Sequence, residues 1–211
     1  MSRSIGNDYI LWIDCEMTGL NAYIPPPDHD NSKPFLPDRI LEIAAVVTDK
    51  DLNMLDNGVE YIVKTDKEVL DNMNEWCVHQ HGKTGLTAAC LTSTTTMQQV
   101  DQLVSDYVRG HFTSINNNGH SIETRALLAG NSVHADKLFI KKDLPQLNQL
   151  LHYRILDVST IKELVSRWYP QVSRPDKNKS DHRAMSDIKD SIAELKHYRK
   201  HVFVDPAKLI D

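Results

Sequence analysis

Residues 9–16 read YILWIDCE, and this stretch decides the fold class. Its apolar part is too short to form a helix of its own and is rich in β-forming residues, so it predicts a buried strand. A second apolar run, ILEIAAVVT at 40–48, predicts another buried strand, and residues 58–64 alternate well enough for a third. Turn-forming residues at 51–57 separate the last two strands. Together the three strands predict an antiparallel meander.

The rest of the chain alternates helical and strand-like patterns. Apolar residues at three- and four-residue spacing predict helices, and two short apolar runs predict strands. The expected helices span 67–79, 97–108, 158–168 and 183–200, and the expected strands span 126–130 and 153–157. Parallel strands that are joined through helices form right-handed crossovers. We therefore predict an α/β fold with a mixed central sheet, in which the meander and the parallel strands are flanked by helices.

Length and composition fit one domain. The chain has 211 residues, of which 40% are hydrophobic and 25% charged, so we expect a single domain over 8–205 with flexible ends at 1–7 and 206–211. Residues 21–39 hold five of the nine prolines and predict a proline-rich surface insertion. The polar stretch 113–126 predicts a second surface loop.

The apolar runs and the cysteines indicate in which compartment of the cell the protein is expected. No stretch approaches the roughly 18 to 20 consecutive apolar residues of a membrane span, and the first residues are polar and contain no secretory h-region. Cys15, Cys77 and Cys90 form no C-x-x-C pair and leave an odd cysteine, which argues against a disulfide framework. We expect a reducing intracellular compartment.

Net charge limits the partners. The chain has 29 acidic and 24 basic residues, and its formal net charge is −5. Proteins that bind long nucleic acids through their overall field are usually basic. The charge balance therefore argues against long nucleic acids as partners.

Asp14 and Glu16 lie two residues apart at the end of the first predicted strand. In an extended chain their side chains leave the same face. Two adjacent carboxylates beside a core repel each other and lose hydration, which is costly unless a cation lies between them. A solvated strand end is the alternative. Cys15 points the other way and is expected to be a core thiol rather than a nucleophile.

Two further acids follow later elements. Asp136 comes after the strand and turn LLAGNSVHAD, where an early-turn acid favoured by the helix dipole is the alternative explanation. Asp187 lies in the early turns of the last predicted helix, which Ser180 or Asp181 is expected to cap. Because His182 precedes Asp187 by five residues, the two converge only if His182 lies on the frayed entry to that helix.

Together these residues fit one chemistry. Carboxylate oxygens are the ligands that Mg²⁺ and Mn²⁺ prefer, and two such ions about 4 Å apart clamp the attacking and leaving oxygens of a phosphodiester. We expect two divalent cations, Mg²⁺ or Mn²⁺, held by Asp14, Glu16, Asp136 and Asp187. A histidine with a pKa near neutrality can take a proton from the attacking water, so His182 is expected to be the catalytic base.

The same residues lie in segments that resemble the oligoribonuclease family of DEDDh 3′-to-5′ exonucleases. In chain order these segments are WIDCEMTGL, ILEIAAVVTD, MNEWCVHQHGKTGL, LAGNSVHADKLF, HYRILDVSTIKEL and DHRAMSDIKDSIAEL. The four carboxylates and the histidine of the family motif fall on the five residues named above. The resemblance implies a ribonuclease H-like fold, mitochondrial or cytoplasmic activity, and hydrolysis of short RNA from the 3′ end to nucleoside 5′-monophosphates. The implied substrates run from dinucleotides to about five nucleotides.

The resemblance also implies substrate-binding roles. Leu20, which follows Met17 in the same substrate-binding segment, resembles a wedge between two bases, and Trp76 resembles an aromatic residue stacked on the 3′ base. His81 matches a contact to the 3′ sugar or phosphate, and Ser132 matches a cap of the 5′ phosphate. Without the resemblance, Trp76 would be a core residue of its helix and His81 an exposed histidine at a helix end.

Tyr153 and Arg154 resemble residues that reach across a homodimer to the neighbour's substrate, where a guanidinium binds a terminal phosphate bidentately. Read from the sequence alone, Tyr153 is the amphipathic start of a strand and Arg154 a solvated neighbour. The dimer is therefore implied by the resemblance alone. Basic residues also crowd the segment around His182, at Arg174, Lys177, Lys179 and Arg183. They either steer phosphate or form a solvated charge run.

Two other functions stay open at this point. A DEDDh exonuclease that acts on longer RNA or DNA 3′ ends would use the same chemistry, with an open channel in place of a closed pocket. A catalytically dead nucleic-acid-binding module would be expected to lack at least one of the carboxylates or the histidine. The sequence lacks none of them, so this second alternative is the weaker one.

Overall fold

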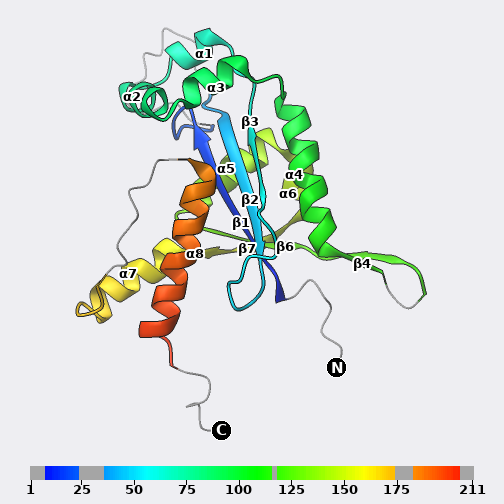
Figure 1. The fold of residues 1–211 in the computed structure, drawn as a ribbon, viewed down its shortest axis with the longest axis vertical. Helices are drawn as coiled ribbons and strands as arrows, with labels where there is room; N and C mark the ends of the chain where they lie inside the picture. The colour runs from blue at the N-terminus through cyan, green and yellow to red at the C-terminus, as the bar shows by residue number, and fades with distance from the viewer. Residues whose placement is uncertain (1–7, 24–35, 116–117, 174–182, 205–211) are drawn as a thin grey trace.

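A five-stranded sheet forms the centre of the molecule. A computed structural model of the chain describes residues 8–23, 36–115, 118–173 and 183–204. The strands of the sheet are β1 (Ile10–Met17), β2 (Ile40–Thr48), β3 (Val59–Ile62), β6 (Ala126–Gly130) and β7 (Leu151–Asp157), in the order β3-β2-β1-β6-β7 (Figure 1). β1, β2 and β3 pair antiparallel, whereas β6 pairs parallel with β1 and β7 pairs parallel with β6. The predicted mixed sheet with its antiparallel meander is therefore confirmed.

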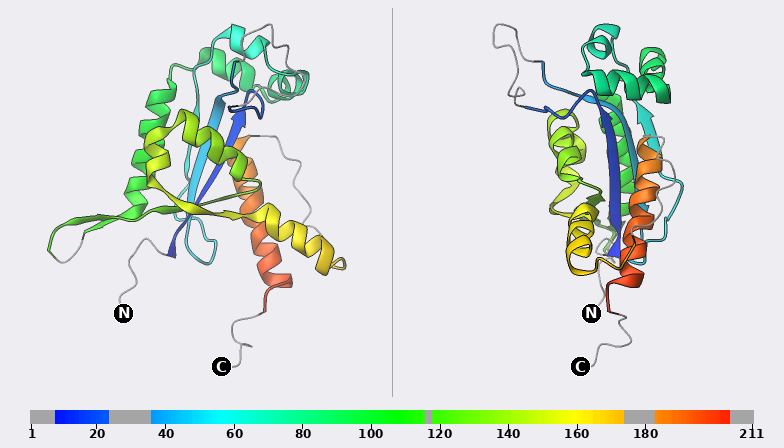
Figure 2. Two further views of the ribbon diagram at one scale, coloured as in Figure 1. Left: turned by 180° about the vertical axis from the view of Figure 1, so that it is seen from behind. Right: turned by 90° about the vertical axis from the view of Figure 1, so that its left-hand side faces the viewer.

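Helices cover both faces of this sheet, as the edge-on view in Figure 2 shows. The described helices are α1 (Lys67–Asp71), α2 (Glu75–Thr84), α3 (Leu86–Thr92), α4 (Met97–Phe112), α5 (His134–Asp143), α6 (Pro145–Leu150), α7 (Val158–Trp168) and α8 (Ala184–His201). One apolar core packs the sheet against α4, α5 and α6, and a second packs the opposite face against α7 and α8. The first three helices gather beyond the carboxyl end of β1 (Figure 1).

Alternation along β1 sends its side chains to the two faces. The odd-numbered residues from Leu11 to Cys15 are buried in the core beneath α4, α5 and α6. Trp12 is buried on the opposite face, in the core formed with α7 and α8. Asp14 and Glu16 continue the series that Trp12 begins, so their carboxylates leave β1 on the α8 face. Cys15 is a buried thiol, as the sequence predicts.

The prediction of one helix at 67–79 is wrong, because this segment forms two helices, α1 and α2. Asn74 sets the boundary: its side chain accepts a hydrogen bond from the Cys77 backbone N–H at 2.9 Å and caps the N-terminus of α2. Gly85, with φ of 79°, ends the same helix in the left-handed conformation that glycine tolerates. Trp76 therefore lies in the first turn of a separate helix.

Part of the loop predicted at 113–126 is instead a two-stranded ribbon. β4 (Thr113–Ile115) pairs antiparallel with β5 (Ser121–Glu123). The ribbon extends away from the sheet beyond α4 (Figure 1). Antiparallel pairing satisfies backbone N–H and C=O groups that an irregular loop would leave to water, which explains why so polar a stretch forms strands.

Several sequence predictions fall outside the described residues. They concern the two flexible ends, residues 24–35 of the proline-rich insertion and the entry to the last helix at 174–182. That helix, α8, begins at Ala184, so its N-cap position is Arg183 rather than Ser180 or Asp181. Within the described ranges, no helix combines the length and apolar character needed to cross a membrane.

Candidate active site

Three carboxylates gather where the end of β1 meets the first turn of α8. Asp14 and Glu16 leave β1 on the α8 face, and Asp187 lies in the first turn of that helix. Oxygen atoms from the three side chains all lie within 4.8 Å of one another. Asp14 and Glu16 are half-buried rather than solvated, so the alternative of a solvated strand end is wrong.

Asp136 approaches the same strand from the other core. It lies in the first turn of α5, is buried, and accepts a hydrogen bond through Oδ1 from the Cys15 backbone N–H at 3.0 Å. Because Cys15 separates Asp14 from Glu16, Asp136 contacts β1 between the other two acids. The helix dipole favours an acid at this position, but it does not explain why the side chain is buried against β1.

The start of α8 is fixed by a buried acid that the sequence analysis missed. Glu42 of β2 is 0% exposed and lies opposite Glu16 in the sheet. Arg183 Nε donates to its two carboxylate oxygens at 2.9 and 3.0 Å, and the Ala184 backbone N–H donates to Oε2 at 3.2 Å. Arg183 therefore forms a structural ion pair, and the two interpretations of it as solvated or phosphate-steering are wrong. The signal in the sequence that could have indicated this role of Glu42 is its position as a single acid inside the apolar run 40–47.

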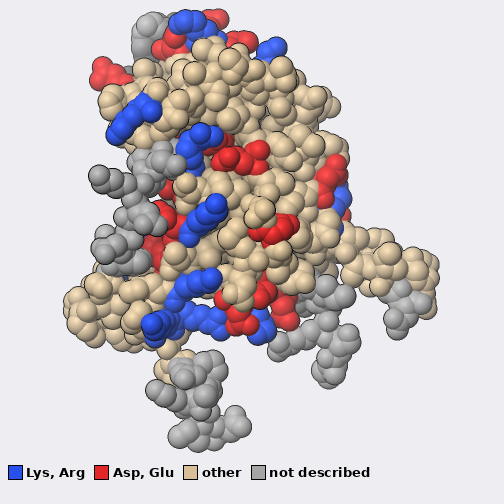
Figure 3. All heavy atoms as spheres, in the orientation of Figure 1, with Lys and Arg blue, Asp and Glu red and all other residues tan. Residues whose placement is uncertain are grey.

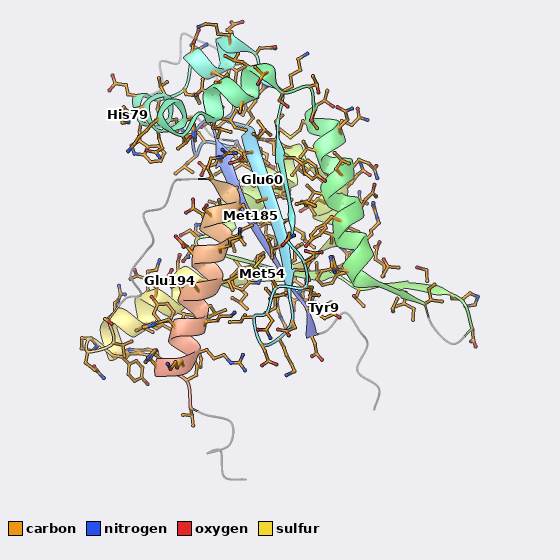
Figure 4. All side chains as sticks on the ribbon, viewed as in Figure 1. Tyr9, Met54, Glu60, His79, Met185 and Glu194 are labelled. Atoms are coloured by element: carbon orange, nitrogen blue, oxygen red, sulfur yellow. The ribbon has the colours of Figure 1, made fainter. Side chains whose placement is uncertain are left out.

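A second carboxylate supports the same helix end. Figure 4 places Glu60 of β3 beside Met185, and Glu60 Oε1 accepts a hydrogen bond from the Met185 backbone N–H at 3.3 Å. Two acids thus bind N–H groups that have no partner within the helix, where the helix dipole favours negative charge. This anchoring directs Asp187 toward Asp14 and Glu16.

Burial and crowding raise the pKa values of Asp14, Glu16 and Asp136. Burial is the largest cause for Asp14, whose pKa lies well above its usual value, and the negative charge of Asp136 adds to it. Burial, and next the charge of Asp187, raise the pKa of Glu16 to about 8. Burial raises the pKa of Asp136 to about 7. A cluster of hard oxygen donors with excess negative charge fits a divalent cation, which would favour the ionised form of each ligand.

A pocket of about 420 Å³ opens beside the carboxylates, between the end of β1 and α2. Its lining includes Glu16 and four of the predicted substrate-binding residues, Met17, Leu20, Trp76 and His81. Leu20 and Trp76 are exposed, at 73% and 61%. Trp76 is therefore not a core residue, and the fold brings these four residues to one place beside the acids.

His81 is the buried member of this group. It is 1% exposed, its Nε2 lies 2.9 Å from the Met17 carbonyl oxygen, and its Nδ1 lies 3.9 Å from Glu16 Oε2. Since a carbonyl oxygen only accepts, Nε2 carries the hydrogen in this contact. The alternative of an exposed histidine at a helix end is wrong. His81 joins α2 to the carboxylate end of β1.

Ser132 lies just past the end of β6, the parallel neighbour of β1. Its backbone has φ of 53°, uncommon for a residue with a side chain, and its N–H is shared between Asp157 Oδ1 and Ser159 Oγ, both at 2.9 Å. The preceding residue, Asn131, donates through Nδ2 to Glu194 on α8 at 3.0 Å. These bonds hold the exposed Ser132 side chain at the carboxyl end of the parallel strands.

Tyr153 and Arg154 lie on β7, the edge strand of the sheet. Tyr153 is 74% exposed, and the Arg154 guanidinium carbon lies 5.3 Å from the centre of its ring. Asp157, further along β7, pairs with Gly130. At about 3.3 Å per residue and 4.8 Å per strand, Tyr153 lies roughly 20 Å from Asp14 of the same chain. The fold therefore does not bring this pair to the chain's own carboxylates.

His182, the predicted base, lies outside the described residues, as do Arg174, Lys177 and Lys179. Arg183, which follows His182 in the sequence, is the first described residue of this segment. The pairing of Arg183 with Glu42 fixes the point at which the chain enters α8.

The chain is similar to known proteins over most of its length. A family model described as an exonuclease matches residues 11–195. The chain is 44% identical over 195 residues to the mitochondrial oligoribonuclease of Mus musculus, covering 92% of this chain and 73% of that protein. It is 41% identical over 199 residues to the oligoribonuclease of Rhodococcus jostii, covering 93% and 89%. It is 42% identical over 192 residues to a probable oligoribonuclease of Schizosaccharomyces pombe, covering 91% and 68%.

Solved structures support the fold. The zinc-bound complex of E. coli exonuclease I with single-stranded DNA matches with a TM-score of 0.64 at 14% identity, over 92% of this chain and 41% of that one. The exonuclease I of Methylocaldum szegediense matches with a TM-score of 0.62 at 15% identity, over 92% and 41%. The chain thus spans about two fifths of the length of these enzymes. At such low identity the likeness shows the fold alone, which is ribonuclease H-like, as the resemblance implied.

The raised pKa values predict a stability that depends on pH and metal. In metal-free protein the carboxyl groups of Glu16 and Asp136 have pKa values of about 8 and about 7, against about 4 in an unfolded chain. The folded state therefore binds more protons, so its stability is fully present below about pH 4 and is lost as the pH rises through the folded pKa values. We expect the thermal midpoint of metal-free protein to fall between about pH 5 and about pH 8.

Scanning calorimetry at constant ionic strength checks this expectation. Added Mg²⁺ or Mn²⁺ should raise the midpoint more at about pH 8 than at about pH 5, because ionised carboxylates bind the cation. Glu16→Gln removes one of the titrating groups and should flatten the profile. A midpoint of metal-free protein that rises with pH over this range would contradict the assignment.

Proposed function

The chain belongs to the oligoribonuclease family of exonucleases, and from this premise we propose that it is a metal-dependent 3′-to-5′ exoribonuclease. Its substrates are short oligoribonucleotides, from dinucleotides to about five nucleotides, which it hydrolyses to nucleoside 5′-monophosphates. One observation carries the proposal. The pocket of about 420 Å³ adjoins the carboxylate cluster and presents exposed Leu20 and Trp76 beside it.

Two divalent cations, Mg²⁺ or Mn²⁺, would be held by the four carboxylates Asp14, Glu16, Asp136 and Asp187. Bound there, such ions supply Lewis acidity to the scissile phosphate and offset the charge that develops on the attacking and leaving oxygens. The chain itself supplies preorganised ligands from three elements, β1, α5 and α8. His182 takes the proton from the attacking water as the general base.

The 3′ base would lie in the pocket between Leu20 and Trp76, with Leu20 as a wedge between this base and the next, and with Met17 and His81 at the sugar and phosphate. Stacking on an apolar or aromatic side chain uses the π-face that every base offers, so this arrangement holds a base without reading its identity. Ser132, at the carboxyl end of β6, would cap the 5′ phosphate with its hydroxyl. Together these contacts would span the substrate from its 3′ base to its 5′ phosphate.

A DEDDh exonuclease for longer RNA or DNA 3′ ends is the second candidate. The likeness of the fold to exonuclease I, whose E. coli structure is a complex with single-stranded DNA, favours it. Long substrates call for a basic path along which the backbone can run. The net charge is −5, and basic and acidic side chains are interspersed on the face in Figure 3. These observations support short substrates.

The enzyme would act inside the cell, in the mitochondrion, the cytoplasm or both. Three free cysteines, all buried, suit a reducing compartment. Mammalian relatives that carry the name mitochondrial oligoribonuclease support the first location.

Substrate length gives the first test of this function. A 5′-phosphorylated diribonucleotide should be hydrolysed with a kcat/KM at least about tenfold above that of a 20-mer RNA, because a pocket that contacts both ends excludes a continuing chain. Product chromatography with both substrates at equal metal concentration measures the ratio. Asp187→Asn serves as the inactive control for contaminating nucleases. Equal kcat/KM values would favour the second candidate.

Separate roles for the base and the ligands give the next test. His182→Ala should lower kcat by about 10²- to 10⁴-fold and leave Mn²⁺ affinity unchanged, as expected for a general base. Asp187→Ala should weaken Mn²⁺ binding as well as lower kcat, because it removes a ligand. Titration calorimetry with Mn²⁺ and single-turnover kinetics distinguish the two. His79→Ala, on the surface of α2, is the matched histidine control (Figure 4).

We also propose a homodimer in which Tyr153 and Arg154 of one protomer cover the 5′ phosphate bound by the other. The distance of roughly 20 Å between Tyr153 and Asp14 of one chain supports a role in trans. An exposed aromatic ring with a guanidinium beside it, on an edge strand, suits recognition of a terminal phosphate.

Mixing two impaired variants tests this arrangement. Asp14→Ala lacks a metal ligand and Arg154→Ala lacks the phosphate contact, but a mixed dimer contains one site in which both residues are present. If the residues act in trans, random exchange of protomers should restore about a quarter of the wild-type rate. If both act within one chain, no mixed site is complete and the rate stays at the sum of the two variants.

A further inference from the structure

We propose that Asp38 is a positioning residue for substrate binding, which fixes Leu20 beside Trp76 and so sets the space available to the base between them. The inference rests on the proposed function. Asp38 lies in the described end of the proline-rich insertion, immediately before β2.

The Asp38 carboxylate bridges the two residues that flank Gly19 and Leu20. Its Oδ1 accepts a hydrogen bond from Thr18 Oγ1 at 2.8 Å, and its Oδ2 accepts one from the Asn21 backbone N–H at 2.8 Å. Hydrogen bonds to an ionised acceptor are shorter and stronger than neutral ones. One planar group therefore holds both ends of the short turn that carries Leu20.

Backbone groups add to this contact. Thr18 N–H donates to the Arg39 carbonyl at 3.0 Å, Asp38 N–H donates to the Asn21 carbonyl at 3.1 Å, and Arg39 N–H donates to Thr18 Oγ1 at 3.1 Å. We call these four residues, Thr18, Asn21, Asp38 and Arg39, the Asp38 clamp. The clamp ties the two ends of the proline-rich insertion together, so the position of Leu20 is set at the base of the insertion.

Gly19 permits the clamp to close. A β-carbon at this position would lie 2.5 Å from Asp38 Oδ2 and 2.8 Å from Oδ1, which is closer than non-bonded atoms approach. Any larger residue would push the carboxylate away from its two donors. Gly19→Ala and Asp38→Ala should therefore disturb the same contact from opposite sides.

The clamp matters because Leu20 has little else to hold it. Its side chain is 73% exposed, yet it lines the pocket together with Trp76. A side chain on an unrestrained turn would have to be ordered each time a substrate bound, and that ordering costs affinity. With the backbone fixed on both sides, the gap between Leu20 and Trp76 exists before the base arrives. The clamp thus acts on substrate binding rather than on the carboxylates.

Steady-state kinetics on a 5′-phosphorylated diribonucleotide test the proposal. Asp38→Ala and the isosteric Thr18→Val, which removes the Thr18 hydroxyl, should each raise KM roughly tenfold, with kcat and Mn²⁺ affinity close to wild type. Thr18→Ser keeps the hydroxyl and should restore the wild-type KM. Asp49→Ala is the matched control and should not change KM. It removes an acid that accepts hydrogen bonds from the Asp51 and Asn53 backbone N–H groups in an exposed turn.

A double variant identifies the route of the effect. If Asp38 acts through Leu20, then Asp38→Ala combined with Leu20→Ala should have the same KM as Leu20→Ala alone. Multiplied effects, or a loss of Mn²⁺ affinity in Asp38→Ala, would overturn the proposal. If Asp38→Ala leaves KM unchanged while Leu20→Ala raises it, the clamp proposal is wrong and the wedge role of Leu20 stands. An unchanged KM in Leu20→Ala would instead refute the wedge role in the proposed function, and the clamp with it.

Discussion

Repulsion among buried carboxylates is the constraint on which the rest of this structure depends. The end of β1 and the elements around it bring Asp14, Glu16, Asp136 and Asp187 together, and Glu42 lies directly opposite Glu16. Arg183 balances Glu42. Burial raises the pKa values of Asp14, Glu16 and Asp136, so the folded chain resists full ionisation of this cluster. The apolar cores on the two faces of the sheet must offset the free-energy cost of burying these acids. They also hold the acids where a divalent cation can bind to them.

The sequence predicted the sheet because its signals there are local and periodic. The apolar run 40–48 is buried along its whole length, as expected for a strand with covered faces. Alternation in β1 predicted that Asp14 and Glu16 share a face, which the position of Trp12 identifies as the α8 face. The division of the segment 67–79 into two helices could not be predicted from periodicity. The apolar pattern runs through the segment without a break, and a single side-chain cap, Asn74, sets the boundary.

The supporting residues of the site escaped prediction for a different reason. Glu42 and Arg183 are far apart in the sequence, and their pairing appears only when β2 and α8 meet. His81 reads as a helix-end histidine until the fold places its ring against Met17 and Glu16. Trp76 satisfies the pattern of a core residue, yet the pocket leaves it exposed. Periodicity predicts which side of an element is buried in general, but it does not predict which side chains line a cavity at its end.

Net charge and pocket geometry together connect the fold to the length of the substrate. An overall field attracts a long nucleic acid through many phosphates, whereas a dinucleotide offers one or two and releases few counterions. In the proposed function, a chain with a net charge of −5 obtains its binding free energy locally, from stacked bases and from cations held by its acids. Two divalent cations would neutralise the charge of the four carboxylates at the site. Part of the acid excess thus belongs to the site, and a short substrate is the kind that such a site can hold without help from the rest of the surface.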